Sequence, residues 1–186
     1  MEVLEQLPHI KVDPKDLHAF CADPANKQNN KRIVITQFLT QDMVERMDGT
    51  PYNKQDYRNN PHEYTDTFHK YLDGVSWLVN GIYWEAKYPR VLSKDKLKKA
   101  VLAGKSKLMG LTDISADYEG SVEFTSRFTS IEEPFLLYDP VTKSFKEKIK
   151  EFTKDEILFH SVDHLPAEMP KEASDHFGSK LMPFVK

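Results

Sequence analysis

The stretch "KLMGLTDISADYEGS", residues 107–121, decides the fold because an apolar run ends there in an acidic loop. Residues 107–115 have the composition of a strand covered on both faces, and Gly120 marks a turn. Asp113 and Asp117, four residues apart, follow that strand. The residues alone leave two interpretations open, solvated loop acids or a coupled pair of carboxylates that acts as general acid and base.

The same alternation of apolar runs and polar breaks extends along the chain. Strands are predicted at 9–14, 32–39, 74–84, 107–115 and 157–166, and residues 121–128 alternate like a further strand. Helices are predicted at 14–20, 62–72, 95–102 with Ser93 as cap, and 170–185, while 3–7 is the last turn of a helix. The loops are 23–31 and an irregular excursion at 42–62. Strands that alternate with helices favour an α/β layer with a mainly parallel sheet.

Composition excludes several classes of function. A chain of 186 residues with a net charge of −3 and a pI near 6.2 fits one domain, and we expect no nucleic-acid partner. No run of about 18 apolar residues is present, and "MEVLEQLPHI" lacks the order of a secretory signal, so we expect no membrane partner. The single cysteine, Cys21, cannot form an internal disulfide, which favours a reducing compartment.

The carboxyl ends of the predicted strands carry the candidate site, because ligands of open α/β sheets bind there. Asp13 follows the first strand and is either a ribose-binding acid or a turn former before Pro14. Gly81 allows a close backbone approach to a ligand, or else marks a bulge. Trp77 and Trp84 are expected to pack in the core or at its edge.

Metal and covalent chemistry find little support. A strand through His160, Asp163 and His164 would place the two histidines on one face and the aspartate on the other, so we expect no metal site. The sequence holds no GxSxG, Walker or HExxH motif, and no motif in it indicates a covalent nucleophile.

Three segments carry a specific resemblance: "LVNGIYWEAKYPRVLSKDKL", "LTDISADYEGSVEFTSRFTSIEEPFLLYD" and "ILFHSVDHLPAEMPKEASDHFGSKLMPFV". "DISAD" followed by "SVEF" and then "DHLPAEMPKEAS" is the distinctive combination. Together these segments resemble the lysine-ketoglutarate reductase region of the bifunctional aminoadipic semialdehyde synthases, in the alanine dehydrogenase and transhydrogenase superfamily. The resemblance covers nearly the whole chain and is strongest from 78 to 185. It implies a reductase that joins L-lysine and 2-oxoglutarate into saccharopine with NADP(H), or alternatively NAD(H), as cofactor.

The resemblance also implies roles for individual residues. In the alanine dehydrogenase relatives an aspartate in a D-Q-G-G loop lies beside the nicotinamide and the substrate, and Asp117 matches it, with Glu119 in place of the first glycine. Their N-M-P turn corresponds to residues 163–166, which implies cofactor contacts from Asp163 and Leu165. The remaining cofactor-binding residues implied are Asp13 at the ribose and, beside the adenosine, Gly81, Ile82 and Tyr83.

Relatives carry a Gly-rich phosphate loop and a catalytic lysine and histidine upstream of this region. The chain is therefore expected to be a fragment, with residues 1–169 a partial dinucleotide-binding domain without its first strand and Gly-rich loop. Residues 170–186 would form a helix leading back toward a catalytic domain. The fold expected is an incomplete Rossmann-like, doubly wound, mainly parallel sheet with flanking helices, inactive by itself.

Further expectations follow. A sheet without its central strand exposes unpaired edges, so we expect a homo-oligomer. Family members from animals are mitochondrial, which implies the same location. Two alternatives remain open: a related NAD(P)-dependent amino-acid dehydrogenase, and a non-catalytic interaction module of the same fold.

Overall fold

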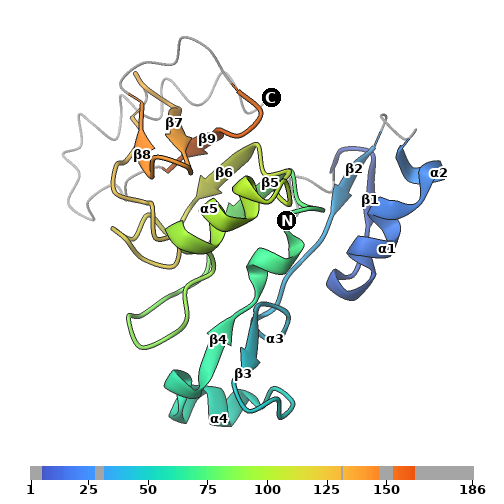
Figure 1. Cartoon of the computed structure of the whole chain (residues 1–186), viewed down its shortest axis with the longest axis vertical. Coiled ribbons are helices and arrows are strands. Elements are labelled where there is room, and N and C mark those ends of the chain that lie inside the picture. Colours follow the sequence, from blue (N-terminus) through green and yellow to red (C-terminus); the bar gives the residue numbers. More distant parts are fainter. Residues whose placement is uncertain (1–5, 28–31, 131, 147–152, 162–186) are drawn as a thin grey trace.

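The computed structural model describes residues 6–27, 32–130, 132–146 and 153–161, and its architecture is mixed α/β (Figure 1). Its strands form a parallel pair, an antiparallel pair and one five-stranded sheet. The predicted helix at 170–185 and most of the helical turn predicted at 3–7 lie outside the described residues. Among the helices that are described, none is long and apolar enough to cross a lipid bilayer.

The five-stranded sheet has the order β5-β6-β9-β7-β8. Neighbours β5, β6 and β9 are parallel, as predicted, whereas β7 pairs antiparallel with both β9 and β8. The sheet is thus mixed. A tight turn makes β7 and β8 antiparallel: the Asp139 carboxylate accepts the Val141 amide at 2.8 Å, and Lys143 adopts φ 58°. The strand bounds are β5 Trp77–Asn80, β6 Gly110–Asp113, β7 Leu136–Asp139, β8 Ser144–Phe145 and β9 Ile157–His160.

Helix α5 (Lys94–Leu102) confirms the helix predicted at 95–102 and lies alongside the sheet (Figure 1). Its predicted cap is also present, since the Ser93 hydroxyl accepts the backbone N–H of Lys96 at 3.3 Å. Buried Leu97 packs from this helix into a core that the sheet fills from the other side. The sheet side chains of that core include Leu78, Leu111, Leu136, Tyr138, Ile157 and Phe159.

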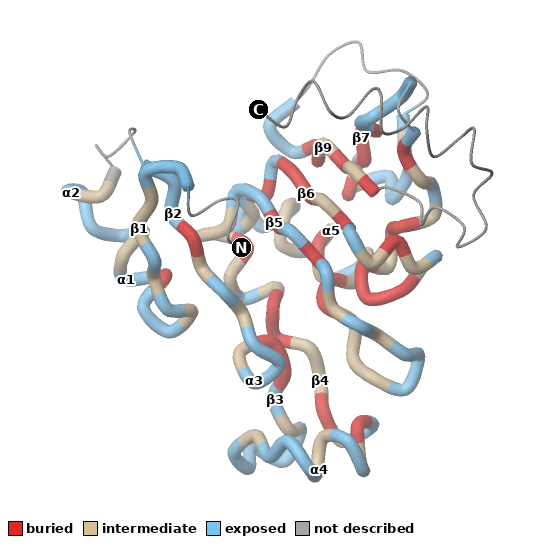
Figure 2. Tube along the Cα trace, turned by 180° about the vertical axis from the view of Figure 1, so that it is seen from behind, coloured by how far each residue is buried: buried red, intermediate tan, exposed pale blue. Residues whose placement is uncertain are grey.

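A parallel pair of short strands, β1 (His9–Lys11) and β2 (Ile33–Ile35), stands apart from the five-stranded sheet (Figure 2). The chain between them forms η2 (Pro14–Asp16), α1 (Leu17–Ala22) and α2 (Pro24–Lys27), so part of the predicted loop at 23–31 is helical. Leu17 is buried, and a Cβ added at Gly74 would meet its Cγ at 3.2 Å. This close contact joins α1 to the segment that enters β5.

Residues 40–71 correct two sequence predictions. The excursion at 42–62, predicted to be irregular, contains regular helices and a strand. The helix predicted over 62–72 is wrong, because Tyr64 pairs with Arg46 in an antiparallel ladder instead. The spaced apolar residues pack in two different places: Phe68 and Leu72 enter the core, whereas Tyr64 packs against Tyr57. The elements are α3 Thr40–Met43, β3 Val44–Arg46, α4 Lys54–Asn59, η3 Pro61–Glu63, β4 Tyr64–Asp66 and η4 Phe68–Tyr71.

The strand suggested at 121–128 is absent from the described structure apart from one bridge between Leu92 and Val122. The chain turns instead, with the Thr125 amide donating to the Val122 carbonyl at 3.1 Å. This turn directs Ser121 and Thr125 inward, where both hydroxyls bind the end of the sheet.

Candidate functional site

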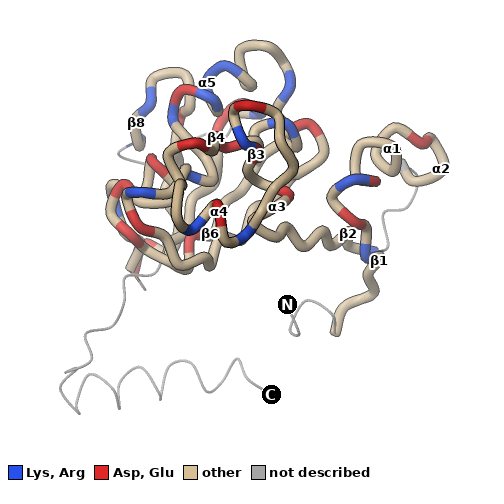
Figure 3. The backbone as a smooth tube through the Cα atoms, turned by 90° about the horizontal axis from the view of Figure 1, so that it is seen from below, with Lys and Arg blue, Asp and Glu red and all other residues tan. Residues whose placement is uncertain are grey.

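The carboxyl ends of three parallel strands meet at one edge of the five-stranded sheet. Asn80, the last residue of β5, is opposite Asp113, the last residue of β6, and Thr112 is opposite His160 of β9. Loops that leave these ends can therefore reach a common ligand. Lys, Arg, Asp and Glu are interspersed along the described backbone when it is seen from below (Figure 3).

Asp113 is buried at this edge and all its hydrogen bonds are internal. Its Oδ1 accepts the Asn80 amide at 2.8 Å and the Ser115 hydroxyl at 2.7 Å, and its Oδ2 accepts the Thr125 hydroxyl at 2.5 Å. Three donors satisfy a charge that would otherwise be costly to bury. Asp113 therefore has the environment of a residue that fixes the strand ends.

A second set of hydrogen bonds extends this network to β9. The Ser161 hydroxyl donates to the Asp113 carbonyl at 3.1 Å, and the Thr129 hydroxyl donates to the Ser161 carbonyl at 2.6 Å. Asn80 also donates to the Ser121 hydroxyl at 2.8 Å. Sequence reasoning missed these residues; the available signal was a small polar residue directly after each apolar run.

Asp117 lies partly exposed in the loop that follows β6. The turn needs Gly120, because an added Cβ would come within 2.4 Å of the Asp117 Cβ. Arg90 holds the loop from outside by donating to the carbonyls of Glu119 (2.9 Å) and Gly120 (3.0 Å). The pair of carboxylates proposed from sequence thus has unequal settings: Asp113 is enclosed, and Asp117 lies at the surface.

Glu119 has left-handed backbone (φ 45°). Its carboxylate pairs with the Lys94 ammonium at 2.7 Å, and this hydrogen bond and charge lower the pKa of Glu119. The glutamate therefore anchors its loop to the start of α5.

Gly81, Ile82 and Tyr83 continue from β5. A Cβ added at Gly81 would meet only the Ile114 Cβ, at 3.9 Å, so this glycine is open to close approach. Ile82 packs against the core, whereas the side chain of Tyr83 is 84% exposed. Ile82 and Tyr83 both line a cavity of about 240 Å³.

Asp13 lies at a different hollow, of about 460 Å³, at the carboxyl ends of β1 and β2. Its side chain is exposed and caps no N–H of the 3-10 turn that follows, whereas its backbone carbonyl accepts the Asp16 amide at 3.0 Å. Two lysines and a second acid share the hollow. The charged residues that line it are Lys11, Asp13, Lys15 and Asp42.

Helix α3 separates the two cavities: Gln41 and Asp42 line the hollow at Asp13, and Thr40 and Met43 line the smaller cavity. The structure therefore brings Gly81 beside the end of β6 but places Asp13 at another hollow. Asp163 and Leu165 lie outside the described residues.

Within the described ranges no three His, Cys, Asp or Glu side chains are grouped so that they could hold a metal ion. His160 is half-buried and packs edge-on against Phe135, with ring centroids 5.5 Å apart.

No protein-family model matches the chain. Individual proteins do match it along its length. It is 37% identical to an alpha-aminoadipic semialdehyde synthase of Arabidopsis thaliana over 99% of the chain, and 32% identical to the mitochondrial alpha-aminoadipic semialdehyde synthase of Mus musculus over 100% of it. The mitochondrial protein of that name from Bos taurus is 34% identical over 55% of the chain.

The chain spans 18% of the plant protein's length and 21% of the mouse protein's length. Both matches cover all or nearly all of the chain. The resemblance drawn from the three sequence segments is thereby confirmed. The chain belongs to the alpha-aminoadipic semialdehyde synthase family, as the counterpart of one segment of those proteins.

Proposed function

We propose that this chain is the cofactor-facing part of a lysine-catabolic reductase that condenses L-lysine with 2-oxoglutarate to saccharopine, using NADP(H). The relatives that match 99–100% of the chain are named alpha-aminoadipic semialdehyde synthases, which supports a role in lysine degradation. Because the chain corresponds to about a fifth of those proteins, we propose that it is inactive by itself.

One observation carries the proposal. Asn80, Asp113 and Ser161 are joined by hydrogen bonds and fix the ends of three parallel strands at one edge, where Rossmann-like folds bind dinucleotides. Above this fixed base, Gly81 is open to close approach and Asp117 is partly exposed. Together with Asp13, these residues have the chemistry that a nucleotide needs. Asp13 is an exposed acid for ribose hydroxyls, Gly81 allows close contact, and Asp117 is a loop acid for the reacting atoms.

The proposed cofactor contacts are Asp13 with the ribose hydroxyls and residues 81–83 with the adenosine. Asp163 and Leu165 are proposed contacts from the strand-to-loop turn after β9. Asp117 would hold or move a proton beside the reacting carbon. The cofactor supplies the hydride when bound.

The choice between NADP(H) and NAD(H) depends on the hollow at Asp13. An acid there suits a free 2′-hydroxyl, whereas Lys15 in the same hollow suits a 2′-phosphate. We propose NADP(H) with NAD(H) as the alternative donor.

Two other functions compete. A related NAD(P)-dependent amino-acid dehydrogenase would use the same edge with another substrate, and a non-catalytic interaction module would bind no nucleotide at all. Titrating the full-length protein that contains this chain with NADPH and NADH, and then assaying oxidation with L-lysine plus 2-oxoglutarate, separates the three. The proposal expects NADPH oxidation that requires both substrates. Oxidation with another amino acid alone, or no nucleotide binding, would contradict it.

We also propose self-association and a mitochondrial location. Edge strand β5 carries the exposed side chains of Trp77 and Val79, and unpaired edges of this kind favour pairing with another chain. The mammalian relatives are named mitochondrial. A strictly monomeric mass in dilute solution would refute self-association. Recovery of the native protein in the cytosolic fraction would refute the mitochondrial location.

A further inference from the structure

The cavity of about 240 Å³ between α4 and the loop after β5 has an unusual lining. Five aromatic residues line it together with apolar side chains such as Met43 and Val91, and no carboxylate belongs to the lining. Cavities for drug-sized ligands have about 300–1,000 Å³, so this one suits a smaller molecule with a single ring. The aromatic residues that line it are Tyr52, Tyr57, Tyr83, Trp84 and Tyr88.

The aromatic wall is held in place by its own contacts. Tyr57 stacks on Tyr88 with centroids 5.1 Å apart and an interplanar angle of 29°, and it lies 5.8 Å from Tyr52. The Trp84 indole donates to the Tyr88 carbonyl at 3.1 Å. Burial, together with the neighbouring phenols of Tyr52 and Tyr88, raises the pKa of Tyr57 to about 12, so this phenol remains protonated and able to donate at neutral pH.

The charged side chains that line the cavity, Lys54, Arg58 and Arg90, are all positive. Arg90 already donates to two carbonyls and lies 5.3 Å from the Trp84 ring. Lys54 and Arg58 of α4 are exposed, and in the described part of the chain the side chain of neither forms a hydrogen bond or an ion pair. Arg58 and Tyr52 both line the cavity; burial raises the pKa of Tyr52, and the Arg58 charge opposes that rise.

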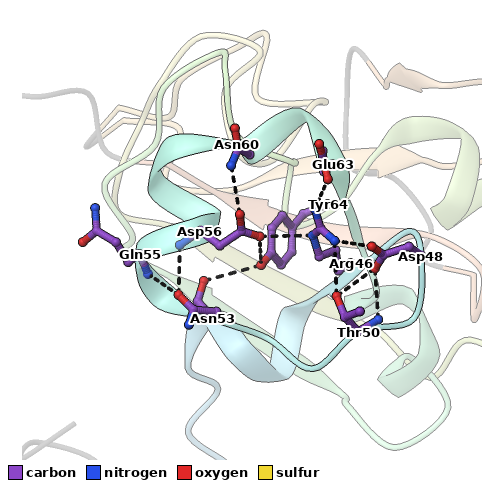
Figure 4. A network of polar contacts seen from close by, with 9 residues as sticks. All are labelled: Arg46, Asp48, Thr50, Asn53, Gln55, Asp56, Asn60, Glu63 and Tyr64. Carbon is purple, nitrogen blue, oxygen red and sulfur yellow. Dashed lines mark hydrogen bonds and ion pairs between the residues drawn. The ribbon is translucent and has the colours of Figure 1, made fainter.

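A polar network holds α4, the helix that carries Lys54 and Arg58 (Figure 4). The Arg46 guanidinium pairs with Asp48, Glu63 and, at 3.1 Å, Asp56 of α4. Asp56 also accepts the Tyr64 hydroxyl at 2.8 Å. With Asp56 held on the Arg46 side, Tyr57 and Arg58 line the cavity.

From these observations we infer that the cavity binds a small aromatic carboxylate, with its ring among the tyrosines and its carboxylate at Lys54 and Arg58. The tyrosines provide stacking and edge contacts for the ring, and the two unpaired cations provide the positive charge that pairs with a carboxylate. Helix α3 separates this cavity from the hollow at Asp13, whereas Ile82 and Tyr83 line the cavity and are also proposed contacts of the adenosine. The inference does not depend on the proposed reductase activity.

The test uses fluorine NMR titration of the full-length protein that contains this chain. The probe is 4-fluorobenzoate, and the controls are 4-fluorobenzamide, which keeps the ring without the charge, and acetate, which keeps the charge without the ring. We expect 4-fluorobenzoate to bind at least about fivefold more tightly than 4-fluorobenzamide, and we expect acetate not to displace it. Equal affinity for the amide, or displacement by acetate at similar concentration, would overturn the inference.

Variants locate the site. Arg58→Gln should weaken binding of 4-fluorobenzoate about fivefold, and adding Lys54→Gln should weaken it about tenfold or more. Arg32→Gln and Lys105→Gln remove the same charges from exposed positions outside the cavity and should leave affinity unchanged. Unchanged affinity in the double variant would place the probe elsewhere and refute the site, whatever the outcome for reductase activity.

Discussion

The Asn80 amide donates to the Asp113 carboxylate at 2.8 Å, and these two residues are directly opposite each other at the ends of β5 and β6. Both are buried, so the hydrogen bond connects the strand ends within the protein interior. Any loop chemistry at this edge depends on that fixed base.

Replacing Asp113 tests the base. Asp113→Ala removes an acceptor shared by the Asn80, Ser115 and Thr125 donors, and we expect a loss of about 3 kcal/mol in the free energy of unfolding. Denaturant titration measures it. Asp155→Ala, at an exposed position, should change stability by less than about 0.5 kcal/mol. Equal effects of the two substitutions would show that the network contributes nothing.

Two glycines at this edge should respond differently to the same added methyl group. Gly120→Ala forces its Cβ against Asp117, and we expect a destabilisation of about 2 kcal/mol. Gly81→Ala has room, so stability should change by less than about 0.5 kcal/mol while nucleotide affinity falls. Denaturation and NADPH titration of both variants check this. Unchanged NADPH affinity in Gly81→Ala would remove Gly81 from the cofactor site.

Asp117→Asn tests the proposed catalytic role. The side chain is partly exposed and the loop is held through backbone carbonyls, so stability should change little. Loss of a positioned acid or base lowers turnover typically by about a hundredfold or more, and we expect that decrease in kcat. Steady-state kinetics of the full-length protein provides the measurement. A variant with wild-type kcat would exclude Asp117 from the reaction.

His69 should make stability depend on pH near neutrality. Burial and the nearby Lys96 charge lower its pKa, against an opposing effect of Asp66. The unfolded chain therefore binds the proton more tightly, and the free energy of unfolding should decrease as pH falls from about 7.5 through 6.5 toward the lower folded pKa.

His69→Gln should flatten that decrease, whereas His62→Gln, at an exposed position, should not. Thermal denaturation between pH 5.5 and 7.5 compares them. Carboxylates with lowered pKa, such as Glu119, contribute only at more acidic pH. Parallel pH profiles for wild type and His69→Gln would contradict the assignment.

Local signals in the sequence predicted part of this fold. The helix at 95–102 with its Ser93 cap, and the strands around residues 78, 111 and 158, depend on periodicity and capping within a few residues. The β3–β4 pair depends on long-range contacts, such as Tyr64 with Asp56 and Arg46 with Glu63, which override the helical spacing at 62–72. No local pattern encodes such pairings.

The candidate site divides in the same way. Asp13, Gly81 and Asp117 could be singled out because strand ends bind ligands. The roles of Asn80, Thr125 and Ser161 follow only from the register of three strands and the turn after Val122, which bring distant polar residues together. The cavity beside α4 depends equally on tertiary contacts.

The most direct test of the central claim is a structure of the full-length protein with bound NADPH. The account predicts that the nucleotide lies along the carboxyl ends of β5, β6 and β9, with its ribose at Asp13 and with residues 81, 117 and 163 along its length. A nucleotide bound at the opposite edge of the sheet, or out of contact with these residues, would contradict the account.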